Sequence, residues 1–307
     1  MDNPPDDDEE EEEEVPVWLR DLCDRLEDDA VILTVLNLNI RRVNRSMMGY
    51  LSRSLVCKCT GLESLNLTSA LENRPGIMTS NQVLQPLIQG VLDSTSCSLK
   101  VLHLSYNVLT DCKGIGTALA RNRVLTELHL DHNRIDCITA TELASGLAMN
   151  QTLQVLQLSS NLIGDHGACS IAAALSQNKH LHTLCLGHNF IGRQGGQALV
   201  DSLWKHKNTS LQRIDVENNP TFPAVLAGWL MALCQANTAG RRTLWFETDK
   251  VPGLVTPILA GATNTPSALY VFLQEVPQSI VPRVPEPNAE DTTDTITHPP
   301  IRKKARH

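Results

Sequence analysis

The 307-residue sequence lacks any stretch long and apolar enough to span a bilayer, and its acidic first residues are unlike a signal peptide. From these absences we expect a cytosolic or nuclear location, or both. The nine cysteines agree, because their number is odd and they are scattered without the spacing of disulfide or zinc frameworks. We expect most of them to be small residues of the core.

Signatures of catalysis are also missing. The sequence has no glycine-rich phosphate loop, no Gly-x-Ser-x-Gly elbow and no His-Glu-x-x-His zinc motif. Its net charge of -8, with no basic stripe among the predicted strands, disfavours nucleic-acid binding. We therefore expect a protein that is not an enzyme, that requires no cofactor or metal, and that binds neither nucleic acid nor membranes.

What the sequence does contain is a repeat. The string Leu-x-x-Leu-x-Leu-x-x-Asn occurs four times, at steps of 26 or 28 residues, and ends at Asn107, Asn133, Asn161 and Asn189. In each string the leucines alternate with other residues, which predicts a short strand with leucines pointing inward. Between 161 and 178, a glycine-containing turn is followed by apolar residues at helical spacing. One repeat is therefore predicted to be strand, turn and helix.

A single unit of this kind cannot bury its apolar face, so neighbouring units must stack. Helices are wider than strands, so we predict an α/β fold: a curved right-handed solenoid with a parallel sheet on its concave face. The closing asparagines, with Asn219 as the fifth, should align as a ladder. Weaker copies are expected at 33–38, 62–67, 211–219, 244–246 and 269–272, and an insertion near 70–78.

The repeat length, the helix in each copy and the Asn-x-Ile/Leu-x-Asp-x-Gly stretch resemble the ribonuclease-inhibitor-like subfamily of leucine-rich repeats. The resemblance is strong from about residue 62 to residue 219. The same subfamily builds the sensing arms of NOD-like receptors, the capping domain of tropomodulins and the GTPase-activating protein for Ran. It implies the fold and a binding surface, but its members serve unrelated partners.

Composition divides the chain into four parts. Residues 1–14 are acidic and expected to be disordered, and residues 15–32 are expected to form a helical cap. The solenoid should occupy 33–274, with degenerate C-terminal repeats and a buried helix at 225–234 that is apolar on nearly all sides. The cap helix should bury one face, formed by Trp18, Leu19, Leu22, Cys23 and Leu26.

Residues 275–307 are expected to be a disordered, Pro-rich tail with a basic end. Four residues of that end fit the short basic pattern of a nuclear-import signal: Arg302, Lys303, Lys304 and Arg306. Two alternatives remain open, namely a solvated basic terminus and a terminus that folds back on the acidic run at 6–14. Four glycosylation-type triplets begin at Asn44, Asn66, Asn150 and Asn208, and we expect them to be silent in an unsecreted protein.

The candidate binding residues lie between the leucines and should face outward from the concave sheet. They are His103, Tyr106, His129, Asp131, His132, Gln157, His188, Asp215, Glu217, Trp245 and Glu247. Adjacent strands lie about 5 Å apart, so His103, His129, Asp131 and His132 should be neighbours. Two interpretations follow for these four, a divalent metal site or a polar recognition surface. The acidic residues near Trp245 suit a basic or mixed protein surface, and the alternative is a solvated face with scattered charges.

Three functions are compatible with this pattern. The first is a monomeric interaction module or adaptor that binds a protein on the concave face. The second is a GTPase-activating regulator of the Ran type, with Arg134 or Arg193 as candidate residues. The third is an acidic nuclear protein that binds basic partners such as histones through residues 6–14.

Overall fold

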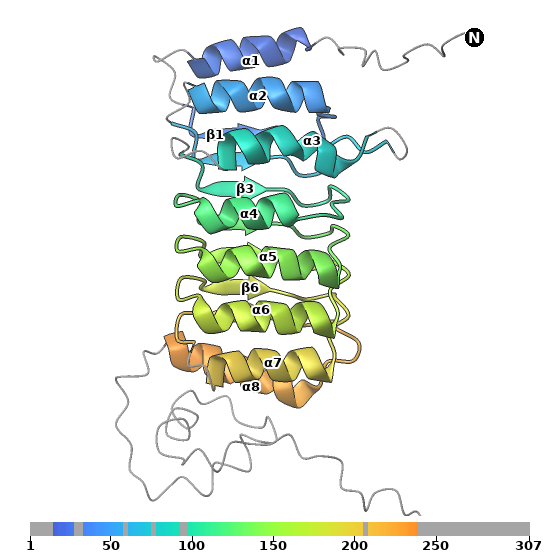
Figure 1. The fold of residues 1–307 in the computed structure, drawn as a ribbon, viewed down its shortest axis with the longest axis vertical. Coiled ribbons are helices and arrows are strands. Elements are labelled where there is room, and N and C mark those ends of the chain that lie inside the picture. The colour runs from blue at the N-terminus through green and yellow to red at the C-terminus, as the bar shows by residue number, and fades with distance from the viewer. Residues whose placement is uncertain are drawn as a thin grey trace, which may run out of the picture.

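The computed structural model describes residues 15–27, 33–57, 61–74, 78–92, 98–204 and 208–238. Within these ranges helices and strands alternate along the chain in a regular stack (Figure 1). The helical elements are α1 (Val17–Glu27), α2 (Arg45–Cys57), α3 (Ser80–Leu87), the π-helical turn η1 (Ile88–Leu92), α4 (Lys113–Arg121), α5 (Cys137–Met149), α6 (Asp165–Gln177), α7 (Arg193–Trp204) and α8 (Ala224–Thr238). The strands are β1 (Val35–Asn37), β2 (Ser64–Asn66), β3 (Val101–His103), β4 (Glu127–His129), β5 (Val155–Gln157), β6 (Thr183–Cys185) and β7 (Arg213–Asp215).

The seven strands form one parallel sheet in chain order, from β1 to β7. The register pairs the central residue of each strand with that of the next: Leu36, Leu65, Leu102, Leu128, Leu156, Leu184 and Ile214. All seven are buried against the helices, which cover one side of the sheet (Figure 1). The predicted solenoid, with its parallel sheet on the concave face, is the observed fold.

The core is a continuous layer of aliphatic side chains between the sheet and the helices, because every repeat contributes the same inward positions. Successive helices also approach closely. A Cβ atom built on Gly116 of α4 would lie 2.5 Å from the carbonyl oxygen of Glu142 in α5, and one on Gly146 would collide with the backbone of Gly116. Glycine is therefore needed at this crossing of α4 and α5.

The asparagines that close the strings form the predicted ladder. The Asn161 amide nitrogen donates to the carbonyls of Leu130 and Leu158, both at 3.0 Å, and its oxygen accepts from the Ile135 N–H at 3.1 Å. Asn107, Asn133, Asn189 and Asn219 bridge repeats in the same way. Each amide thus satisfies backbone groups that the turn leaves unpaired.

A second asparagine ladder, which the sequence analysis missed, lies where each helix returns to the next strand. Its members recur every 28 to 30 residues: Asn122, Asn150, Asn178, Asn208 and Asn237. The Asn150 amide donates to the Leu119 carbonyl at 2.7 Å and accepts from the Leu153 N–H at 2.7 Å. Asn150 and Asn208 head two of the glycosylation-type triplets, and both are buried inside the fold. The regular spacing of the five asparagines was the signal in the sequence that could have identified this second ladder.

The two ends of the stack differ from expectation in one respect each. In α1, Leu19, Cys23 and Leu26 are buried as predicted, but the Trp18 side chain is partly exposed, with the Arg41 guanidinium 5.4 Å from its ring centroid. Helix α8 is not buried all round, since Val225 and Met231 are exposed. Among the described residues α8 packs on α7 and β7, and part of its apolar surface stays uncovered.

In the insertion predicted near 70–78, Arg74 and Met78 exchange two backbone hydrogen bonds, of 2.7 and 2.8 Å. The expected strands at 244–246 and 269–272, the acidic run at 1–14 and the tail at 275–307 lie outside the described residues. Among the helices that the structure describes, none is long and apolar enough to cross a membrane.

Candidate functional site

The outward residues of β3 to β7, together with those that follow each strand, form the surface that we call the sheet face. The first strand position contributes one row of outward residues, Val101, Glu127, Val155, Thr183 and Arg213, and three further columns cross the strands beyond it. The first holds His103, His129, Gln157, Cys185 and Asp215, the second Ser105, Asp131, Ser159, Gly187 and Glu217, and the third Tyr106, His132, Ser160, His188 and Asn218. The strand register aligns the first column directly, as the sequence predicted.

The residues of the third column adopt a left-handed backbone conformation, which determines where their side chains lie. All five of its residues have positive φ, as in Tyr106 at 61° and His132 at 54°. The Tyr106 N–H donates to the Asp131 carbonyl at 3.0 Å, and the His132 N–H donates to the Ser159 carbonyl at 2.9 Å. These bonds hold a conformation that is uncommon for residues other than glycine, and they place the column at the edge of the sheet.

His103 and His129 stack on adjacent strands, with ring centroids 4.2 Å apart and planes tilted by 33°. The His129 Nε2 atom also lies 3.4 Å from a Glu127 carboxylate oxygen. The pKa of His103 is lowered mainly by burial and further by His129, although Glu127 acts in the opposite direction. His103 therefore stays neutral at a pH where an ordinary histidine is protonated.

Tyr106 and His132 form a second aromatic pair along the third column. Their ring centroids lie 4.1 Å apart and their planes are nearly parallel, at 10°. Tyr106 nevertheless keeps 53% of its surface exposed. The pair is a flat aromatic surface that its own stacking already orders.

Asp131 lies between the two pairs and is bonded within the fold. Its Oδ1 atom accepts from the Ser159 N–H at 2.9 Å, and the Ser105 hydroxyl lies 3.5 Å from Oδ2. Burial raises the pKa of Asp131, and the Ser159 hydrogen bond partly offsets this effect. Asp131 thus links the repeats of β4 and β5 as well as contributing charge to the sheet face.

Towards the C-terminal end the sheet face becomes acidic. Asp215 accepts from the Glu217 N–H at 2.9 Å, and Glu217 itself is exposed. A Cβ atom on Gly187 would lie 2.9 Å from an Asp215 carboxylate oxygen, so the glycine makes room for Asp215. In the third column the Nε2 atom of His188 lies 3.0 Å from the Asn218 amide nitrogen.

Two further predicted residues, Trp245 and Glu247, lie outside the described part of the chain, and Gln157 is partly buried in β5. The structure brings His103, His129, Asp131 and His132 into neighbouring positions. Within the described residues, however, no group of three or more His, Cys, Asp or Glu side chains could hold a metal ion. These four residues are therefore neighbours on the sheet face without forming a metal-binding group among the described residues.

Two exposed apolar residues beside the sheet face were missed. Leu162 and Phe190 each follow a ladder asparagine, and they are 48% and 59% exposed. The Phe190 N–H donates to the Ile163 carbonyl at 2.8 Å, which places their turns next to each other. In the repeat before Leu162, the residue after the ladder asparagine is Arg134. The change to an apolar residue at the equivalent positions 162 and 190 was the signal in the sequence.

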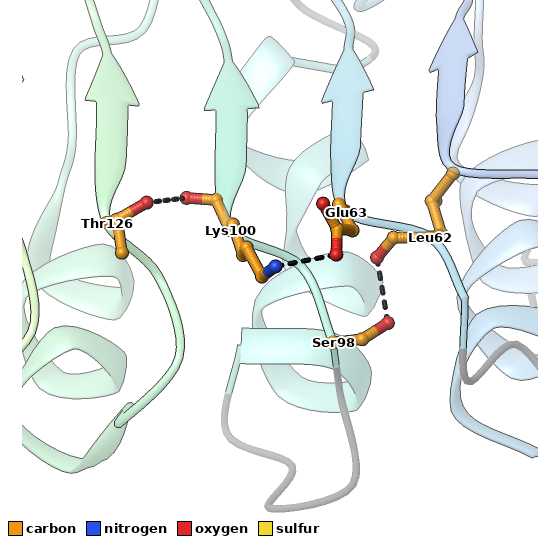
Figure 2. Close-up of polar contacts among 5 residues, drawn as sticks. All are labelled: Leu62, Glu63, Ser98, Lys100 and Thr126. Atoms are coloured by element: carbon orange, nitrogen blue, oxygen red, sulfur yellow. Dashed lines mark hydrogen bonds and ion pairs between the residues drawn. The ribbon is translucent and has the colours of Figure 1, made fainter.

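At the other border of the sheet face, polar contacts join β2, β3 and β4 (Figure 2). Lys100 pairs with Glu63 at 2.6 Å, and the Thr126 hydroxyl donates to the Lys100 carbonyl at 3.0 Å. The Ser98 hydroxyl donates to the Leu62 carbonyl at 2.8 Å. The Lys100 and Glu63 charges therefore offset each other at this border.

A leucine-rich-repeat family model matches residues 95–111, 121–136, 150–172 and 177–200. A search of curated proteins found no match. Solved structures similar to the chain include leiomodin-1 actin-binding site 2, at 26% identity and a TM-score of 0.40, covering 45% of this chain and 79% of that one. Another is the tropomodulin C-terminal domain from Caenorhabditis elegans, at 11% identity and a TM-score of 0.37, covering 72% and 93%. The matched segments and the strand, turn and helix units that the structure describes identify residues 95–200 as leucine-rich repeats.

Proposed function

We propose that this protein is a non-catalytic interaction module that binds another protein on its sheet face. The observation that carries the proposal is the Tyr106–His132 stack, a half-exposed aromatic surface beside a row of polar side chains. Tyrosine is enriched among the residues that dominate binding energy at protein interfaces. Because stacking already fixes both rings, ordering them on binding costs little side-chain entropy.

The surroundings of the stack support the same function. Among the described residues, the helices lie on the side of the sheet opposite to the outward side chains of β3 to β7 (Figure 1). Leu162 and Phe190 add exposed apolar area along one edge. A mixed aromatic, polar and apolar surface of this kind is typical of protein interfaces.

The test is a comparison of the proteins captured by the purified full chain and by two double variants. Tyr106→Asn with His132→Asn removes both rings and retains a residue type that tolerates positive φ. Ile138→Asn with Met149→Gln is the matched control, since both side chains are exposed on α5, away from the sheet face. We expect the first variant to lose partners that the control retains. Equal capture by all three proteins would contradict the proposal.

We also propose that the basic end of the chain directs nuclear import. This proposal rests on the sequence alone, with Arg302, Lys303, Lys304 and Arg306 as the carrying residues. A reporter fused to residues 277–307 is expected to accumulate in nuclei, and the same fusion with these four residues replaced by alanine should not. Equal nuclear and cytoplasmic signal from the intact fusion would contradict it.

A further inference from the structure

We propose that the sheet face recognises an extended, arginine-rich segment of its protein partner. This inference rests on the proposed function and adds the chemical class of the ligand. It is argued from the charges across the sheet face, from the exposed tyrosine stack, and from the length of the surface that a segment would cross.

The charges of the sheet face and its border are mostly negative. Five carboxylates lie there, against three basic side chains, Lys100, Arg134 and Arg213. The carboxylates belong to Glu63, Glu127, Asp131, Asp215 and Glu217. Because Lys100 pairs with Glu63, Arg134 and Arg213 are the remaining positive charges among the described residues of this surface, apart from any protonated histidine. A positively charged ligand is therefore attracted to it.

The aromatic pair favours arginine over lysine. A planar guanidinium can stack on the exposed ring of Tyr106 and still donate to a neighbouring carboxylate, whereas an ammonium group offers no flat surface. The Asp131 carboxylate belongs to the adjacent column, and the Tyr106 N–H donates to the Asp131 backbone at 3.0 Å. Tyrosine and carboxylate thus lie within the reach of one arginine side chain.

The acidic and aromatic groups lie at different points along the stack. The Tyr106–His132 pair follows β3 and β4, while Asp215 and Glu217 belong to the repeat of β7. A segment crossing from β3 to β7 passes four strand spacings, or about 19 Å, which about six extended residues cover. One short segment can therefore contact both the tyrosine and the C-terminal carboxylates.

The probe for the test is a synthetic peptide of about eight residues in which arginine alternates with serine. Its affinity for the full chain is measured by fluorescence anisotropy, beside peptides with lysine or glutamate at the same positions. We expect the arginine peptide to bind more tightly than the lysine peptide, and the glutamate peptide not to bind. The affinity of the arginine peptide should also fall as salt is raised from about 50 to about 300 mM.

Two protein variants with the same change in net charge locate the contact. Asp215→Asn with Glu217→Gln should lower the affinity for the arginine peptide by about fivefold or more. Asp111 and Glu142 lie outside the sheet face. Asp111→Asn with Glu142→Gln should therefore keep the affinity for the arginine peptide within about twofold of that of the unchanged protein. Tyr106→Asn should abolish the preference for arginine over lysine.

Equal weakening by the two charge variants, or equal affinity for the arginine and lysine peptides, would overturn the inference. So would a failure of the intact chain to bind the arginine peptide. The proposed function would survive these results if partners were still lost on replacement of Tyr106 and His132. Retention of all partners by the Tyr106 and His132 double variant would instead contradict the proposed function itself.

Discussion

Replacing Asn161 with alanine should destabilise the solenoid by about 3 kcal/mol. The side chain is buried, donates to the carbonyls of Leu130, Leu158 and Ser159, and accepts from the Ile135 N–H. Each carbonyl keeps another partner, because Leu130 also accepts from Asn133, Leu158 from Asn189 and Ser159 from the His132 N–H. The Ile135 N–H is left buried without its partner, which alone costs about 1–3 kcal/mol, and the lost bonds to the carbonyls supply the rest.

The free energy of unfolding is measured by urea titration followed by circular dichroism. For a chain of this size, the predicted loss corresponds to a fall in Tm of about 6–12 °C. Asn73→Ala is the matched control, because Asn73 is exposed and lies outside both ladders, and it should change stability by less than about 0.5 kcal/mol. A loss below about 1 kcal/mol for Asn161→Ala, with an unchanged denaturant slope, would refute the reasoning.

Three further predictions concern other parts of the fold. Asn150→Ala should cost a similar amount in the same titration, since Asn150 is buried and bonded on both sides, and a neutral result would show that the second ladder is not structural. Gly146→Ala should destabilise by at least about 2 kcal/mol because its Cβ atom meets the Gly116 backbone, whereas Gly228→Ala, with open space around it, should be neutral or stabilise by up to about 1 kcal/mol. The pKa of His103, measured by NMR, should lie below 6.5. Because this pKa is lower in the folded than in the unfolded state, the free energy of unfolding should decrease as the pH falls below about 6.5. The decrease should be smaller in His103→Gln.

The repeat and the first asparagine ladder, which includes Asn161, were predictable because each depends on the local spacing of leucines and asparagines. A leucine at every second strand position has one way to be buried, and an asparagine after each strand meets the same unpaired backbone groups in every repeat. The columns of the sheet face followed from the same register. Asp131 and His129 could therefore be placed before their contacts were known.

The remaining features depend on contacts between distant residues or on backbone conformation. Tyr106 and His132 stack because both adopt positive φ, a state that is uncommon for residues other than glycine. Trp18 was predicted on the buried face of α1, but Arg41, remote in the sequence, lies over its ring at the rim. The burial of α8 depends on which neighbours cover it, and its composition alone could not supply that information.

The proposed binding site is tested most directly by photo-crosslinking. A photoreactive phenylalanine derivative at Ser160 stands in the middle of the third column, at a repeat position where Tyr106 shows that an aromatic ring fits. The same derivative at Met149, which is exposed on α5, is the control. We predict that a protein partner crosslinks to position 160 and not to position 149. Crosslinking at 149 with none at 160 would contradict binding on the sheet face.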